Sequence, residues 1–150
     1  MSEELRVERL IDAPPEIVFD AFVDPDTQAE LHGSKQQGWN VYGCEGEIRV
    51  GGTTVATMGA EGGDRGTETR VYSVVERPSR LVFRYSVQGM GWPQLVETEM
   101  TITFEDQGGK TLVAMVQTGF ERAEDRDRLL YGWPVYLDIL QTIVASKGAV

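Results

Sequence analysis

The sequence has one cysteine, Cys44, and one histidine, His32, in 150 residues. A single cysteine cannot form an internal disulfide. With no basic segment leading into an apolar run at the N-terminus, this favours a reducing cytosol. A metal site would have only carboxylates to add to these two side chains, and no Gly-x-Ser-x-Gly motif accompanies the histidine. We therefore expect no metal and no cofactor, and the inventory favours a non-catalytic protein while leaving an enzyme open.

Positive charge and long apolar runs are also scarce. Fourteen lysines and arginines stand against 24 aspartates and glutamates, which gives a formal net charge of −10. Nucleic acids and anionic membrane surfaces need clustered basic residues, and no apolar run approaches the roughly 20 residues of a membrane helix. We expect no nucleic-acid partner, no membrane insertion and a single cytoplasmic domain over residues 1–150, because this length suits one core.

The residues that are present predict mostly strands. Segment 5–12 is β-prone and stops at two prolines, segment 15–23 has the apolar spacing of a helix, and segment 27–33 fits a short second helix. Beyond them, β-branched and aromatic segments alternate with glycine-rich turns, which indicates an antiparallel meander. The expected strands of the meander are 39–44, 47–50, 53–59, 68–76, 80–87, 96–105 and 111–120.

The segment 96–105 alternates apolar residues with glutamates and threonines, so one face of the sheet is expected to be buried and to need a cover. The C-terminal segment supplies that cover. Its apolar residues recur at spacings of three and four, with Pro134 inside the pattern. We expect a kink or break near 131–134, because proline cannot donate the helical hydrogen bond. The stripe consists of Leu129, Trp133, Leu137, Leu140 and Val144, flanked by Tyr136 and Ile143.

Several motifs occur in an order that resembles the START-like (SRPBCC, Bet v I-like) superfamily. The stretch IDAPPEIVFDAFVDPD resembles its opening signature, and EIRVGG at 47–52 resembles a strand pair of the branch named after the activator of the heat-shock protein 90 ATPase. VVERPSRLVFRY, ITFEDQGGKTLVAMVQTGF and Gly132-Trp133 resemble later elements of that branch. The resemblance implies an α+β helix-grip fold. Such a fold has a curved antiparallel sheet of about six or seven strands, a long C-terminal helix within it, two short N-terminal helices and an enclosed apolar cavity.

Two departures from this pattern concern the cavity. Many relatives have a Trp-Trp-Gly-Pro-like stretch where this chain has Leu31-His32-Gly33-Ser34, and many have a histidine where this chain has Gln117. Any cavity chemistry that depends on those groups is therefore not implied for this chain.

The candidate ligand-binding residues are the side chains expected to face that cavity. Such sites are mostly apolar, with a few polar groups that orient the ligand; here these are Gln117, Arg49 and Tyr136. Each has a structural alternative: a backbone hydrogen bond, a surface ion pair and simple packing, respectively. The loop 88–95 is a candidate gate, or else an ordinary hairpin loop. The full set is Trp39, Arg49, Tyr85, Trp92, Met100, Met115, Gln117, Trp133, Tyr136, Leu137 and Leu140.

Three functions stay open. The first is binding or sequestration of a hydrophobic small molecule (a lipid, polyketide or aromatic metabolite) by a monomer or homodimer. The helix with Gly132-Trp133-Pro134 resembles members of the superfamily that protect against a toxic metabolite. The second is a cyclase, aromatase or hydrolase, which an interior pair of titratable groups with perturbed pKa values would favour. The third is an interaction module like a chaperone cofactor, with the stress-response role that the name of the branch implies. An exposed apolar patch would favour it.

Overall fold

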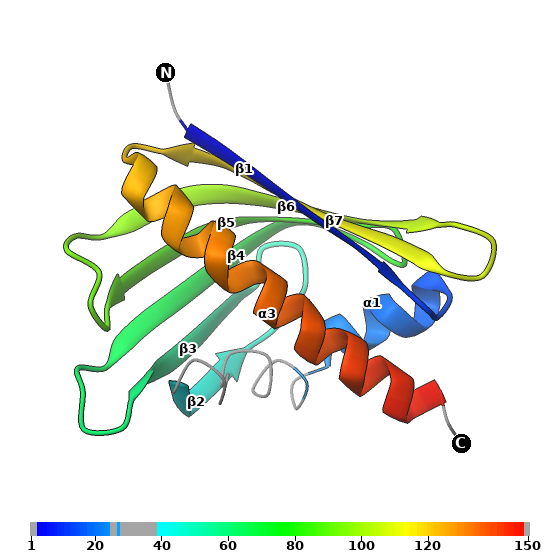
Figure 1. The fold of residues 1–150 in the computed structure, drawn as a ribbon, viewed down its shortest axis with the longest axis horizontal. Coiled ribbons are helices and arrows are strands. Elements are labelled where there is room, and N and C mark those ends of the chain that lie inside the picture. Colours follow the sequence, from blue (N-terminus) through cyan, green and yellow to red (C-terminus); the bar gives the residue numbers. More distant parts are fainter. Residues whose placement is uncertain (1–2, 25–26, 28–38, 149–150) are drawn as a thin grey trace.

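The computed structural model describes residues 3–24, 27 and 39–148. Seven antiparallel strands form one curved sheet, and a long C-terminal helix crosses its concave face (Figure 1). This confirms the expected helix-grip arrangement; the second short helix, expected at 27–33, lies outside the described residues apart from Thr27. The elements are β1 (Glu3–Ile11), α1 (Pro15–Val23), β2 (Trp39–Gly46), β3 (Thr53–Ala60), β4 (Gly66–Glu76), β5 (Arg80–Gly89), β6 (Val96–Asp106), β7 (Thr111–Phe120) and α3 (Ala123–Gly148).

The order of strands in the sheet is β1-β7-β6-β5-β4-β3-β2, so the first strand pairs with the last and β1 and β2 form the edges. Consecutive strands from β2 to β7 are joined by short turns, as an antiparallel meander requires. Of the two described helices, neither is long and apolar enough to cross a membrane.

Helix α1 follows directly from the sequence. Its first residue is Pro15, whose fixed φ suits the first turn of a helix, and Val18, Phe19 and Phe22 are buried at helical spacing. The rings of both phenylalanines pack edge-on against Phe104 of β6, with centroids 5.2 and 5.9 Å away. The helix therefore covers one end of the concave face.

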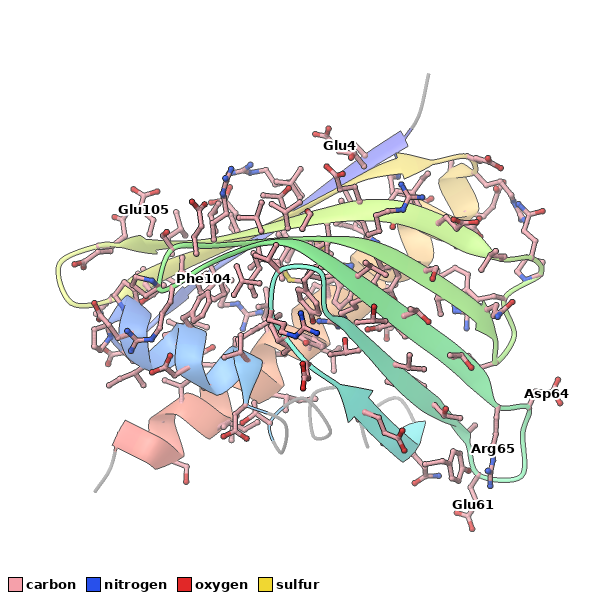
Figure 2. The ribbon with its side chains drawn as sticks, turned by 180° about the vertical axis from the view of Figure 1, so that it is seen from behind. Glu4, Glu61, Asp64, Arg65, Phe104 and Glu105 are labelled. Carbon is pink, nitrogen blue, oxygen red and sulfur yellow. The ribbon has the colours of Figure 1, made fainter. Side chains whose placement is uncertain are left out.

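Strand β6 shows the alternation that the sequence predicts. Val96, Met100, Ile102 and Phe104 are buried, and the polar face is turned outward. In Figure 2, Phe104 lies under the sheet and Glu105 points away from it. Thr98 is also buried, so the inner face is not entirely apolar.

The expected strand at 47–50 is wrong. Strand β2 ends at Gly46, whose φ of +122° turns the chain, and residues 47–52 form a turn closed by a hydrogen bond from Gly52 N–H to the Arg49 carbonyl (2.7 Å). A side chain at Gly46 would collide with the Thr53 carbonyl, so glycine is required there. Backbone hydrogen bonds to Tyr72 hold the turn against β4.

Helix α3 is continuous from Ala123 to Gly148, so the expected break at 131–134 is wrong, and a kink there stays a prediction. Pro134 lies inside the helix, at a local cost of about 3 kcal/mol. Its carbonyl accepts a hydrogen bond from Arg9 Nη2 (3.5 Å), and Arg9 also pairs with Asp138 one turn later. Leu137 and Leu140 are completely buried, which confirms α3 as the apolar anchor of the fold.

Candidate functional site

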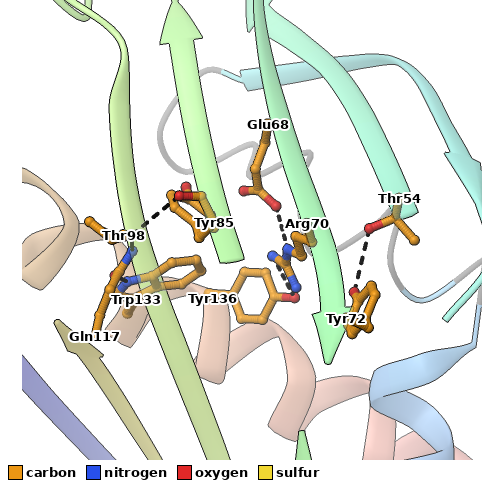
Figure 3. Close-up of polar contacts among 9 residues, drawn as sticks. All are labelled: Thr54, Glu68, Arg70, Tyr72, Tyr85, Thr98, Gln117, Trp133 and Tyr136. Carbon is orange, nitrogen blue, oxygen red and sulfur yellow. Dashed lines mark hydrogen bonds and ion pairs between the residues drawn. The ribbon is translucent and has the colours of Figure 1, made fainter. Parts of the chain in front are cut away.

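The inner face of β4 carries charged residues at the centre of the fold. Glu68, Arg70 and Tyr72 are spaced by two, so their side chains point to one face of the strand. That face is directed at α3, and the side chains of Glu68 and Arg70 are only 6% and 1% exposed (Figure 3). Charged groups are almost never fully buried unless they are paired. The pair therefore marks this part of the interior as different from an apolar core.

Arg70 has partners for only part of its guanidinium group. Its Nε donates to Glu68 Oε1 (2.5 Å) and its Nη2 donates to the Tyr136 hydroxyl (3.4 Å). The group also lies over the Phe83 ring, 5.0 Å from the centroid. Nη1 is buried and has no hydrogen-bond partner among the described residues. An unsatisfied buried donor costs about 1–3 kcal/mol, so it requires an explanation.

A second group of hydrogen-bonded polar residues connects β6, β7 and α3. The Trp133 indole Nε1 donates to Gln117 Oε1 (2.8 Å), and Gln117 Nε2 donates to Thr98 Oγ1 (2.8 Å). Thr98 Oγ1 in turn donates to the Tyr85 carbonyl (3.4 Å). Gln117 therefore bonds to side chains. The alternative expected for it, a hydrogen bond to the backbone, is not what the structure shows. This chain of bonds fixes the orientation of the Trp133 ring.

Aromatic rings connect the two polar groups. The Trp133 ring meets Tyr85 and Tyr136 edge-on, with centroids 5.7 and 5.2 Å away. Trp133 and Tyr136 are three residues apart, so they share the face of α3 that meets the sheet. In Figure 3, Tyr85 lies between the group around Gln117 and the group around Arg70. We name Glu68, Arg70, Tyr85 and Tyr136 the Arg70 cluster.

Burial controls the protonation of the cluster. It raises the pKa of Tyr136 to about 12, and it raises the pKa of Tyr85 well above 10, with a further contribution from the Glu68 carboxylate. Burial alone would lower the pKa of Arg70, but the charge of Glu68, the tyrosines Tyr136 and Tyr72 and the hydrogen bond to Glu68 together outweigh it, so the pKa lies well above its ordinary value. At neutral pH the cluster therefore contains a paired cation and two neutral phenols that can donate hydrogen bonds.

The substitution Tyr136→Phe is expected to reduce the loss of stability between pH 10 and about 12. The folded-state pKa is raised, so the contribution of Tyr136 is complete below pH 10 and is lost as the pH rises through about 12. The free energy of unfolding, measured in urea across this range, should fall less steeply for Tyr136→Phe than for the wild type. The control is Tyr131→Phe, at an exposed position of α3. Equal slopes for Tyr136→Phe and the wild type would contradict the assignment.

The structure buries most of the candidate ligand-binding residues together and excludes one. Arg49 is in the turn after β2, its side chain is 66% exposed, and it pairs with Glu47 (2.6 Å). Its expected inward position is therefore wrong, because the turn directs it to solvent. Trp39 is the first residue of β2, and its side chain lies outside the described part of the structure. The buried candidates are Tyr85, Met100, Met115, Gln117, Trp133, Tyr136, Leu137 and Leu140.

Sequence reasoning missed Glu68 and Arg70. The signal was present in their spacing, since Glu68, Arg70 and Tyr72 must share one face of a strand. The inward arginine was expected at position 49 instead, where the side chain is exposed.

The loop between β5 and β6 is attached to α3. Arg128 Nη2 donates to the Met90 carbonyl (2.9 Å), and the guanidinium group lies over the half-buried Trp92 ring, 4.0 Å from the centroid. Gly89, Met90 and Gly91 all have positive φ, which makes the loop tight. Trp92 thus packs partly against the core, and a gating role for the loop stays a prediction.

The two residues of rare types offer little for catalysis. Cys44 is half-buried, and burial raises the pKa of its thiol, so at neutral pH it is protonated and behaves as a small apolar side chain. His32 lies outside the described residues.

Comparison with solved structures shows the same fold in several bacterial proteins. An uncharacterized protein from Rhizobium leguminosarum is 19% identical, with a TM-score of 0.81 and coverage of 97% of this chain and 96% of that one. A protein from Chromobacterium violaceum is 25% identical (TM-score 0.75, coverage 94% and 96%). The AHSA1-like protein from Aeromonas hydrophila is 24% identical (TM-score 0.74, coverage 97% and 94%). No curated protein matches the sequence.

The family model described as activator of Hsp90 ATPase homolog 1-like protein matches residues 12–145. This range runs from the end of β1 through nearly all of α3 and includes the whole Arg70 cluster. The fold is, in general, that of a ligand-binding type of domain. The chain belongs to the family of activator of Hsp90 ATPase homolog 1-like proteins.

Proposed function

We propose that this protein binds or sequesters a hydrophobic small molecule in its interior, between the concave face of the sheet and α3. The observation that carries the proposal is the Arg70 cluster, with its buried and unpartnered Nη1. Burying an ion pair costs several kcal/mol per ion, and apolar residues of similar volume often stabilise a core as well or better. The pair is therefore better explained by a functional requirement than by stability.

The surroundings of the cluster suit an apolar ligand. Met100, Met115, Leu137 and Leu140 are apolar, and Trp133 offers a flat ring on which a ligand can stack. These side chains belong to one buried cluster, and we propose that a ligand enters by moving some of them apart. Methionine is unbranched and adapts to different shapes, which makes the two methionines suited to such repacking.

The proposal also covers the route by which the ligand enters and the compartment in which the protein acts. The β5–β6 loop, attached to α3 through Arg128, is the segment we propose to open when a ligand enters. We further propose that the protein acts in the cytoplasm as a monomer or homodimer, and protection against a toxic metabolite is one use of such binding.

Binding of the neutral fluorophore N-phenyl-1-naphthylamine tests the proposal. We expect a dissociation constant in the low micromolar range, or roughly −8 kcal/mol. Trp133→Phe and Met115→Ala should weaken binding several-fold, because both residues are buried between the sheet and α3. Glu99→Gln, on the exposed face of β6, is the control and should bind like the wild type. Equal affinity in all variants would mean adsorption to the surface, and no binding would remove the proposal.

An enzyme of the cyclase, aromatase or hydrolase type is the second candidate. The Arg70 cluster meets the criterion set for it, because Tyr85 and Tyr136 are interior titratable groups with raised pKa values. Both phenols stay protonated and can donate hydrogen bonds to a substrate oxygen. The two functions differ in the fate of the ligand. Native mass spectrometry of the small molecules that copurify, repeated after incubation, should recover a carried ligand unchanged and an enzyme's substrate converted.

The outer face of the sheet bears on a chaperone-like interaction module. On β5 and β6 it carries Arg84, Glu97 and Glu99, all exposed, and Arg84 pairs with Glu97 (3.4 Å). A docking face for apolar partners would need a contiguous apolar patch instead. These strands therefore favour the ligand-binding proposal over this alternative.

A further inference from the structure

The Arg70 cluster also restricts the chemistry of the head group that a ligand can present. Arginine has only donors, so a ligand atom that meets Nη1 must be a hydrogen-bond acceptor. Nη1 is buried, and the other two nitrogens of the group already bond to Glu68 and Tyr136. Nη1 carries two N–H groups, so it offers directional positions that only acceptor atoms can fill.

The charge of the site disfavours an anionic head group. Glu68 already neutralises Arg70 through the bond to Nε, so the buried pair carries no net charge. A carboxylate or phosphate would add an uncompensated negative charge near Glu68, in an interior where charges interact strongly. The whole chain carries a net charge of −10, which opposes anions further. A neutral acceptor satisfies Nη1 without this cost.

The rings around the cluster favour a flat ligand body. The guanidinium group lies over the rings of Phe83 and Tyr136, 5.0 and 5.7 Å from their centroids. Trp133 and Tyr85 continue the aromatic lining toward Gln117. A planar apolar molecule can stack among such rings, and an oxygen on its edge can then reach the guanidinium group.

We propose that the ligand is a planar apolar molecule with a neutral carbonyl oxygen, which accepts a hydrogen bond from Arg70 Nη1. This inference rests on the proposed interior binding and names the class of ligand. Gln117, whose amide bonds to Trp133 and Thr98, is a positioning residue that holds the ring of Trp133 for stacking.

Three probes with one bicyclic body test the head group. They are 2-acetylnaphthalene, with a neutral carbonyl, 2-ethylnaphthalene, with no acceptor, and 2-naphthoate, an anion at neutral pH. Each displaces N-phenyl-1-naphthylamine, and the measured quantity is the ratio of the dissociation constants of the ethyl and acetyl probes. We expect this ratio to fall about tenfold in the double variant Glu68→Gln/Arg70→Met, which removes both charges together, because one hydrogen bond to a charged donor is lost.

Single variants separate charge from geometry. In Glu68→Gln, Arg70 is an uncompensated cation, so 2-naphthoate should gain affinity at least several-fold relative to the wild type. Arg70→Lys keeps the charge and removes the planar fork, so it should lower the ethyl-to-acetyl ratio even if the double variant does not fold. Glu99→Gln, on the outer face, should leave all three affinities unchanged.

The outcomes distinguish the two proposals. If no probe and no fluorophore binds, the proposed function fails and this inference fails with it. If the probes bind in the interior but the ethyl-to-acetyl ratio is the same in the wild type, Arg70→Lys and the double variant, only the carbonyl inference is overturned. Tighter binding of 2-naphthoate than of 2-acetylnaphthalene to the wild type would also overturn it.

Discussion

Replacing Arg70 with methionine is expected to destabilise the protein by about 3–5 kcal/mol. The loss comes chiefly from Glu68, which remains buried but loses the guanidinium group that pairs with its carboxylate at 2.5 Å. A buried charge that loses its opposite charge is one of the few causes of so large an effect. The free energy of unfolding in urea, measured at neutral pH for Arg70→Met and the wild type, checks the expectation.

Two controls identify the cause of that loss. The double variant Glu68→Gln/Arg70→Met should recover most of the stability, because it removes the negative charge of Glu68 together with the positive charge that compensates it. Arg84→Met removes an arginine from the exposed pair with Glu97 and should change stability by less than about 1 kcal/mol. A loss at Arg70 no larger than the loss at Arg84 would show that the pair is not the strongly coupled, buried group that we describe.

Leu137→Ala and Leu140→Ala should each cost about 2–5 kcal/mol. Both side chains are fully buried between α3 and the sheet, so truncation leaves a cavity in addition to the lost apolar contact. Thermal or urea unfolding gives the values. Leu130→Ala is the matched control, because it makes the same change on the same helix where the side chain is 41% exposed. Losses below about half a kcal/mol at both buried positions would contradict the role of α3 as the apolar anchor.

The parts of the fold that the sequence predicted well are those where one local rule decides. Pro15 sets the start of α1 and the spacing of Val18, Phe19 and Phe22 sets its buried face. In β6 the apolar residues lie on one face and the glutamates on the other, so the inner face could be predicted without knowledge of the partner strands.

For β4, which carries the site, local rules did not determine which face is buried. Every residue from Thr67 to Arg70 is polar. Alternation along the strand therefore assigns these residues to two faces but does not show which face is buried. The answer depends on Tyr136, which contacts Arg70 from α3, 66 residues away in the sequence. Arg49 was expected to face inward instead, and the turn at 47–52 exposes that side chain.

The helix break wrongly expected near Pro134 has the same origin. Proline weakens a helix locally, and the sequence offers no local compensation. The structure supplies it from β1, where Arg9 bonds to the Pro134 carbonyl and to Asp138. Packing of Trp133, Tyr136 and Leu137 on the sheet then holds the helix together across the proline. Tertiary contacts of this kind outweigh intrinsic helix propensity.

The pairing of β1 with β7 determines the order in which a growing chain can complete its fold. Leu5 pairs with Gln117, so β1, the first of the seven strands to be synthesised, has no partner until almost the whole sheet has been made. The five hairpins from β2 to β7 can form in sequence as they emerge, whereas β1 must wait with Leu5, Val7 and Ile11 exposed to water. Such non-local closure is slow, because the entropy of the intervening chain is lost before the contacts form. The nascent protein therefore spends its longest vulnerable period with an apolar N-terminal strand unpaired, and β1 is the segment that a chaperone would most usefully protect.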